Sequence, residues 1–306
     1  MDYSLSPLPG QSDFGVVVTG FKPEMLDDES VRKQLYDLWI DKGLVVFRET
    51  DGLETQLKLS EVFGECEVHP LLPESDWPHE DKVSVKIDEE AGGIYEVDGE
   101  TRAGWLAWHK DSIYTDKLNH GGILWSITVP EQGGETGFLD QISAYEALPK
   151  DLQERIEGLN VIYQYTRDST EGRFGDQPDR RVRLSAFQED SNKASSTLQR
   201  VIHPMVYEQE HTGRKVINVS PWFADGIEGM ENKEGDALLR EVIAHLMKPQ
   251  RRYYHKYVPG EMVLWDNWRI LHCATGTPMG MKRLMRRTTI FGDYALGRKE
   301  VVEAVA

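Results

Sequence analysis

A histidine and an aspartate two residues apart, His109 and Asp111, lie within the apolar stretch WLAWHKDSIY (105–114). On a β-strand, residues i and i+2 project from the same face, so this pair could supply two neighbouring ligands to one metal ion. His272 is the best candidate for a third ligand, because it ends an apolar stretch just before a Gly/Thr/Pro turn. Two histidines and one carboxylate leave three positions open, which suits Fe(II) enzymes that bind a cosubstrate and O₂ together. The alternative is a surface ion pair, since H-x-D is a common tripeptide.

Two arginines follow His272 in the segment RLMRRTTIFGD (283–293). Arg283 and Arg287 alternate with Met285 on one face of the expected strand, so both are predicted to point inward and Arg286 outward. An inward guanidinium can hold a carboxylate through two parallel hydrogen bonds. The alternative is a basic strand at the surface.

The N-terminal part of the chain is predicted to form a β-α-β unit that would help to position these residues. The β-branched run 14–19 and the run 44–49 are typical of short buried strands. Between them, the acidic residues at 27–30 open a helical pattern that stops at Gly43.

The rest of the chain is predicted to be rich in strands, with few helices. Residues 73–104 are expected to be a loop with a hairpin at Asp98-Gly99. The charged segment 166–200 is expected to be a lid over the site or a plain surface excursion. The whole chain, 1–306, is predicted to be one large β-rich domain. Further strands are expected at 121–129, 201–207, 215–220, 261–267 and 284–293, and helices at 141–158, broken or kinked at Pro149, and 233–247.

Composition excludes some classes of partner. Acidic residues outnumber basic ones by 52 to 35, for a net charge of −17, which argues against nucleic acid or an anionic membrane as partner. A local arginine cluster can still bind an acidic small molecule. The chain has 2 cysteines, no apolar run of membrane-spanning length and no visible secretory signal, so we expect a cytoplasmic protein.

From about residue 14 to 293 the sequence resembles the taurine dioxygenase / 2,4-dichlorophenoxyacetate dioxygenase family of Fe(II)- and 2-oxoglutarate-dependent oxygenases. The resemblance implies a β-rich α+β fold with a double-stranded β-helix (jelly-roll) core and flanking helices. It implies hydroxylation of a substrate with succinate and CO₂ as coproducts, and a homodimer or homotetramer. The matching segments, in chain order, are FGECEVHP (63–70), WHKDSIY (108–114), PEQGGETGFLD (130–140), HTGRKVINV (211–219), WDN (265–267) and HCATG to RLMRRTTIFGD (272–293).

Carried over by position, the resemblance assigns His109, Asp111 and His272 as iron ligands. It assigns Thr136 and Arg283 to the distal carboxylate of 2-oxoglutarate. The same comparison indicates that a carboxylate ligand at position 111 favours hydroxylation over halogenation.

The substrate-binding side departs from taurine dioxygenase. Trp105 and Leu72 replace polar residues, so a substrate with an apolar or aromatic body, such as a phenoxyalkanoate, is expected in place of taurine, while taurine or an alkylsulfonate stays the alternative. The predicted substrate contacts are Arg287, His69, Trp105, Ser112, Trp222 and Phe223.

Two other classes of protein use similar residues. A metal-dependent hydrolase could use the same His/Asp/His site, but the chain lacks the H-E-x-x-H helix that would supply its glutamate base. A cupin-like binding module would have no need for both an iron site and a 2-oxoglutarate site. The oxygenase interpretation therefore accounts for more of the chain.

Overall fold

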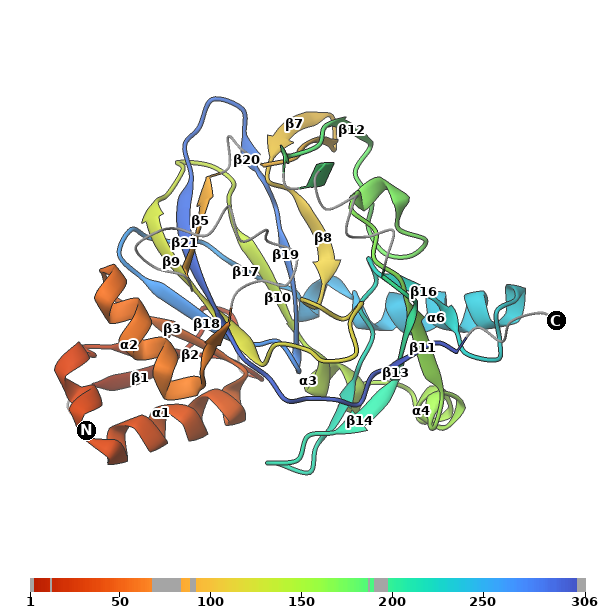
Figure 1. Cartoon of the computed structure of the whole chain (residues 1–306), viewed down its shortest axis with the longest axis horizontal. Helices are drawn as coiled ribbons and strands as arrows, with labels where there is room; N and C mark the ends of the chain where they lie inside the picture. The colour runs from red at the N-terminus through yellow and green to blue at the C-terminus, as the bar shows by residue number, and fades with distance from the viewer. Residues whose placement is uncertain are drawn as a thin grey trace.

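Two β-sheets form the centre of the molecule, and helices lie outside them (Figure 1). The computed structural model describes residues 3–11, 13–67, 84–88, 92–186, 188–189 and 198–301. The larger sheet has the order β1-β2-β3-β18-β9-β21-β4, with β5 also paired to β21. Its strands are β1 Ser4–Pro7, β2 Val16–Thr19, β3 Leu44–Phe47, β4 Cys66–Glu67, β5 Ser84–Asp88, β9 Gly121–Thr128, β18 Met262–Asp266 and β21 Leu284–Ile290.

A second sheet carries most of the candidate chemistry. Its order is β17-β10-β19-β8, formed by β17 Tyr253–His255, β10 Thr136–Asp140, β19 Ile270–Ala274 and β8 Leu106–His109. Buried side chains of both sheets meet in one apolar cluster, so the two sheets pack against each other as layers. This cluster includes Leu124, Val263, Trp265 and Met285 from the larger sheet and Phe138 and Ile270 from the smaller one.

The predicted β-α-β unit is confirmed. Strands β2 and β3 are parallel and are joined through η1 Pro23–Asp27 and α1 Glu29–Lys42. Asp28 caps α1 by accepting a hydrogen bond from the backbone N–H of Ser30 at 2.8 Å. Gly43 ends the helix with φ 73°, a left-handed conformation that glycine adopts without strain. A second helix that the sequence analysis missed, α2 Leu53–Phe63, packs beside α1 (Figure 1).

The other predicted helices are also present. Pro149 separates α3 Gln141–Glu146 from α4 Lys150–Ile156, as its missing N–H predicts. Helix α6 Lys233–Leu246 runs along the side of the molecule opposite α1 and α2 (Figure 1). The remaining elements there are β11 Asn160–Tyr163, β13 Val201–Pro204, β14 Val206–Glu208, β15 Lys215–Ile217, β16 Ala224–Ile227, β22 Arg298–Lys299 and η5 Pro249–Arg251.

The expectation of a loop over 73–104 is partly wrong. The hairpin at Asp98-Gly99 is present as β6 Ile94–Val97 and β7 Glu100–Ala103. However, β5 is a strand, paired with β21 about 200 residues later in the chain. A local pattern rich in Pro, Glu and Gly does not reveal such a distant partner.

The segment 166–200 contains η4 Ser169–Glu171 and β12 Arg180–Arg183, which pairs with β6 beside β7 and β20 Thr277–Pro278. Its role as a lid stays a prediction. Within the described ranges, no helix has the length and apolar character needed to cross a membrane.

Candidate active site

The three predicted metal ligands lie together where β8 and β19 pair. His109 is the last residue of β8 and lies opposite His272 of β19 in the antiparallel register. One ligand atom from each of His109, Asp111 and His272 lies within 4.8 Å of the others, and all three residues are buried. The expectation that His109 and Asp111 share a strand face is wrong, because β8 ends at His109 and Asp111 lies in the turn that follows. Ser112 in that turn has φ 56°, and the turn brings Asp111 back toward the histidines.

The orientation of these groups fits a divalent metal ion. The Nε2 atoms of His109 and His272 lie 3.7 and 3.6 Å from the same oxygen, Oδ1 of Asp111. Nδ1 of His109 lies 2.7 Å from the carbonyl oxygen of Ala107, a contact that places the proton on Nδ1 and leaves the Nε2 lone pair facing Asp111. Two imidazole nitrogens and one carboxylate oxygen converging in this way form the donor set that non-haem Fe(II) prefers.

The charge states of the ligands agree with this fit. Burial, followed by the neighbouring His109, lowers the pKa of His272 to about 4, so its imidazole is neutral near pH 7 and can donate its lone pair. Burial alone would raise the pKa of Asp111, but Arg287 and His272 hold it well below its usual range. The site therefore presents a neutral imidazole at His272 and an anionic carboxylate at Asp111.

Arg287 orients the carboxylate of Asp111. Its Nη2 donates to Oδ2 of Asp111 at 2.6 Å, which leaves Oδ1 facing the two histidines. The guanidinium carbon lies 5.1 Å from the ring centre of Trp265. Arg287 thus points inward, as its position on β21 predicts.

Asn267 holds the backbone of Asp111 from both sides. Its Oδ1 accepts from the Asp111 N–H at 2.9 Å, and its Nδ2 donates to the Asp111 carbonyl oxygen at 3.0 Å. Asn267 lies in the turn between β18 and β19, so the same turn fixes Asp111 and leads to His272. The segment WDN (265–267) matches the family, but the sequence by itself does not indicate this role for Asn267.

On a strand that continued through His109 and Asp111, Lys110 would project from the opposite face, away from the site, but the structure places it otherwise. Its side chain is fully buried. Nζ donates to Oδ1 of Asn218 at 2.9 Å and to the carbonyl oxygen of Trp268 at 2.6 Å. Burial lowers its pKa to about 7, against the opposing effect of the buried carboxylates Asp266 and Asp140. Lys110 lies between His109 and Asp111, and its hydrogen bond to Trp268 therefore connects this part of the chain to the turn that precedes His272.

Thr136 and Arg283, predicted to bind 2-oxoglutarate, lie at one side of the same cavity. Thr136, the first residue of β10, accepts a hydrogen bond at Oγ1 from the hydroxyl of Tyr257 at 2.9 Å. The guanidinium carbon of Arg283 lies 5.5 Å from the Tyr257 ring centre. Tyr257 is not predictable from the sequence, because nothing near it in the chain indicates that it contacts Thr136.

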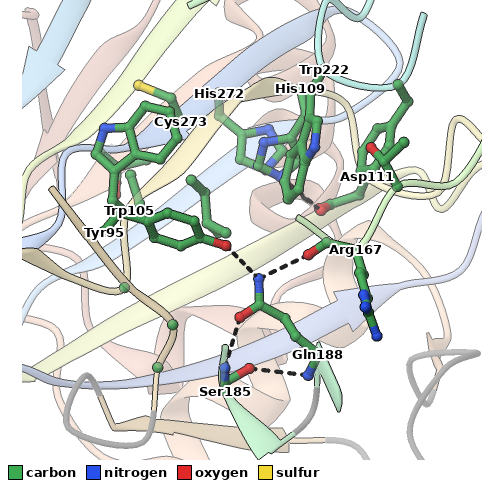
Figure 2. A pocket seen from close by; sticks show the side chains of 18 of the residues that line it. Tyr95, Trp105, His109, Asp111, Arg167, Ser185, Gln188, Trp222, His272 and Cys273 are labelled. Carbon is green, nitrogen blue, oxygen red and sulfur yellow. Dashed lines mark hydrogen bonds and ion pairs between the residues drawn. The ribbon is translucent and has the colours of Figure 1, made fainter. Parts of the chain in front are cut away.

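The cavity has a volume of about 340 Å³. Two further predicted residues, His69 and Leu72, lie outside the described residues. Every other predicted site residue lines this cavity: His109, Asp111, His272, Thr136, Arg283, Arg287, Trp105, Ser112, Trp222 and Phe223. Trp222 stacks on Phe223 with ring centres 4.6 Å apart and meets His109 edge-on at 5.3 Å, so an aromatic wall adjoins the metal-ligating side chains (Figure 2).

Comparison with known proteins places the chain in a family. Residues 4–289 match the family described as taurine catabolism dioxygenase TauD, TfdA family. The chain is 31% identical to the (S)-phenoxypropionate/alpha-ketoglutarate-dioxygenase of Sphingobium herbicidovorans, with 96% of each chain covered. It is 27% identical to the alpha-ketoglutarate-dependent 2,4-dichlorophenoxyacetate dioxygenase of Cupriavidus pinatubonensis, over 88% of this chain and 91% of that one. The fold also matches a crystal structure of a taurine dioxygenase from Burkholderia xenovorans, with a TM-score of 0.74, 22% identity, and 99% and 97% of the two chains covered. The chain therefore belongs to the TauD/TfdA family and is an oxidoreductase that uses Fe(II), 2-oxoglutarate (alpha-ketoglutarate) and O₂.

Proposed function

We propose that this dioxygenase hydroxylates a small organic acid with an apolar or aromatic body, such as a phenoxyalkanoate, and releases succinate and CO₂. The observation that carries the proposal is the composition of the cavity, which brings together three metal-ligating groups, two inward arginines and an aromatic wall. Its volume of about 340 Å³ is in the range, roughly 300–1,000 Å³, of small-molecule sites. The 31% identical relative named for (S)-phenoxypropionate supports the same substrate class.

We propose that the iron is held by His109, Asp111 and His272. Arg287 fixes the carboxylate of Asp111, and Asn267 fixes its backbone. Bound iron supplies the activation of O₂ that couples the decarboxylation of 2-oxoglutarate to substrate hydroxylation. An ion held by only these three side chains would remain accessible to the cosubstrate and to O₂.

Arg283 and Thr136 are proposed to bind the distal carboxylate of 2-oxoglutarate. Arg283 is 6% exposed, so a carboxylate beside it is largely shielded from water and the charge-assisted hydrogen bonds are strengthened. Tyr257 donates to Thr136 Oγ1, which leaves the threonine hydroxyl proton free to donate to the cosubstrate.

Arg287 is proposed to contact the acidic group of the substrate as well. A guanidinium carries five N–H donors, and Nη2 uses one of them on Asp111. Among the described residues its buried Nε has no hydrogen-bond partner. A substrate carboxylate could therefore take a remaining donor, while Trp105, Trp222 and Phe223 contact the apolar body and Ser112 lies at the edge of the cavity.

We also propose that the core of the fold is a double-stranded β-helix. The larger sheet and the β17-β10-β19-β8 sheet, packed as layers around the site, fit the two halves of a double-stranded β-helix.

Substrate-triggered succinate formation tests the function. Purified enzyme with Fe(II), 2-oxoglutarate and O₂ is offered phenoxyacetate, both enantiomers of 2-phenoxypropionate, taurine and an alkyl sulfate. We expect succinate to rise with an aryloxyalkanoate and to stay at background with its methyl ester, which lacks the anion. Asp111→Ala should reduce turnover to background. Succinate formation with taurine alone would favour the aminosulfonate alternative, and hydrolysis that persists without O₂ and 2-oxoglutarate would favour a hydrolase.

A further inference from the structure

The side-chain amide of Gln188 joins three separate parts of the chain beside the cavity. Its Nε2 donates to the hydroxyl of Tyr95 at 3.0 Å and to the carbonyl oxygen of Arg167 at 2.9 Å. Its Oε1 accepts from the backbone N–H of Ser185 at 2.9 Å. Figure 2 shows the Tyr95 hydroxyl and the Arg167 carbonyl converging on this amide. We call Gln188 and these three partners, all of which line the cavity, the Gln188 hub.

The Gln188 hub is a packed feature and not a surface contact. Gln188 is 8% exposed, and Tyr95 is fully buried. Gly93 makes room for both: a Cβ added there would lie 2.5 Å from Oε1 of Gln188 and 3.0 Å from Cε2 of Tyr95. A side chain at position 93, directly before β6, would therefore displace the amide of Gln188 from its present position.

The hydrogen bonds of Gln188 are directed into the protein. An amide nitrogen has two donors, and both are used on Tyr95 and Arg167. The amide oxygen has accepted the Ser185 N–H. The amide therefore has little capacity left to bind a polar ligand. It forms a fixed part of the cavity wall.

The hub is connected through two aromatic side chains to the strand that carries His109. His109 ends β8, and Trp105 directly precedes that strand. Four residues of extended chain span about 13 Å, at roughly 3.3 Å per residue. Trp105 in turn packs on Tyr95 with ring centres 5.9 Å apart, and the Tyr95 hydroxyl accepts a hydrogen bond from Nε2 of Gln188. His109, Trp105, Tyr95 and Gln188 therefore form a connected series of residues that line the same cavity.

We propose that the Gln188 hub is a fixed wall of the substrate cavity and limits the length of the apolar body that the enzyme accepts. This inference rests on the proposed function, since it concerns the apolar part of the same substrate. Gln188 is a positioning residue: it acts by holding Tyr95 and the backbone at Arg167 in place. We expect a one-ring aryloxyacetic acid to fit inside the cavity. A second ring in line with the first would contact the Gln188 hub.

The test compares two probes that differ in length, phenoxyacetic acid and 4-phenoxyphenoxyacetic acid. Their kcat/KM values are measured for the wild type, Gln188→Ala, Gln188→Met and Gly93→Ala. The methionine keeps the length of the side chain but none of its hydrogen bonds, and the alanine at position 93 pushes against Oε1. Gln199→Ala, which removes an exposed glutamine outside the cavity, is the matched control.

We expect the ratio of kcat/KM for the long acid to that for the short acid to rise about tenfold or more in the three hub variants. The control should keep the wild-type ratio. Hydrogen exchange gives a readout that does not depend on turnover: the Ser185 amide should exchange faster in Gln188→Met, because its acceptor is gone.

Each outcome decides the proposal. An unchanged ratio in variants that still turn over phenoxyacetic acid overturns the wall assignment and leaves the proposed function intact. If the wild type forms no succinate with any aryloxyalkanoic acid, the proposed substrate class fails and this inference fails with it. A Ser185 amide that exchanges equally fast in wild type and Gln188→Met would show that the hub does not hold its segment, which also overturns the proposal.

Discussion

His120 provides a test of how burial near the site controls stability. Its ring stacks on Trp268 with ring centres 3.7 Å apart and packs on Trp39 at 4.3 Å. Within the described residues its buried Nε2 has no hydrogen-bond partner. Burial, helped by the nearby His211, lowers the pKa of His120 to about 3. His120→Phe keeps a stacking ring and removes the titrating group.

The sign of the effect follows from proton linkage. Between the folded pKa of about 3 and the ordinary value of 6.5, the unfolded chain binds a proton at His120 and the folded chain does not. The stability linked to the neutral ring is therefore fully present above pH 6.5 and is lost as the pH falls toward 3. At about 1.4 kcal/mol per pKa unit, the loss reaches roughly 2 kcal/mol at pH 5 and about 5 kcal/mol below pH 3.

Asp266 is the group that could oppose this effect. Its Oδ1 lies 3.9 Å from Nε2 of His120, and an ionised carboxylate there would favour a charged ring. Burial, however, raises the pKa of Asp266 to about 7, against the opposing effect of Arg269, so the carboxyl is largely neutral at pH 5. We therefore expect little compensation from Asp266.

The measurement is urea unfolding of metal-free wild type and His120→Phe at pH 7.5 and pH 5.0. The free energy of unfolding of the wild type should fall by about 2 kcal/mol more than that of the variant between the two values. The variant itself serves as the control, because every other titrating group is shared. An equal fall in both proteins would refute the reasoning and would mean that His120 accepts a proton without cost.

Two further predictions concern Lys110 and Tyr257. Lys110→Met removes the hydrogen bonds to Asn218 and Trp268, so we expect the Kd for Mn(II), measured by titration, to rise about 10–100-fold, while Lys117→Met, at an exposed lysine of the same loop, leaves it unchanged. An unchanged Mn(II) affinity in Lys110→Met would show that these bonds do not position the ligands. Tyr257→Phe removes the donor to Thr136 Oγ1, so the KM for 2-oxoglutarate should rise roughly 3–10-fold with little change in kcat at saturation. A fall in kcat with an unchanged KM would contradict a role in cosubstrate binding.

The sequence alone determined the features that depend on neighbouring residues or on residue chemistry. Asp28 and Gly43 mark the ends of α1 through bonds to backbone groups a few residues away, and Pro149 separates α3 from α4 because it lacks an N–H. The types and spacing of His109, Asp111 and His272, together with the order of the segments that match the family, predicted a metal-ligating set of two imidazoles and one carboxylate.

The tertiary structure decided everything that depends on distant partners. Strand β5 forms only because β21 lies beside it, and Asp111 reaches the histidines through a turn held by Asn267, more than 150 residues away. Lys110, in a position that an alternating strand would expose, is buried because β8 ends at His109 and the turn directs its side chain to Asn218 and Trp268. Gln188 lies in the charged segment 166–200, for which the sequence predicted a lid or a plain surface excursion. Its hydrogen bonds to Tyr95 and Arg167 make it part of the cavity, because a side-chain amide is satisfied by whatever groups the fold brings to it.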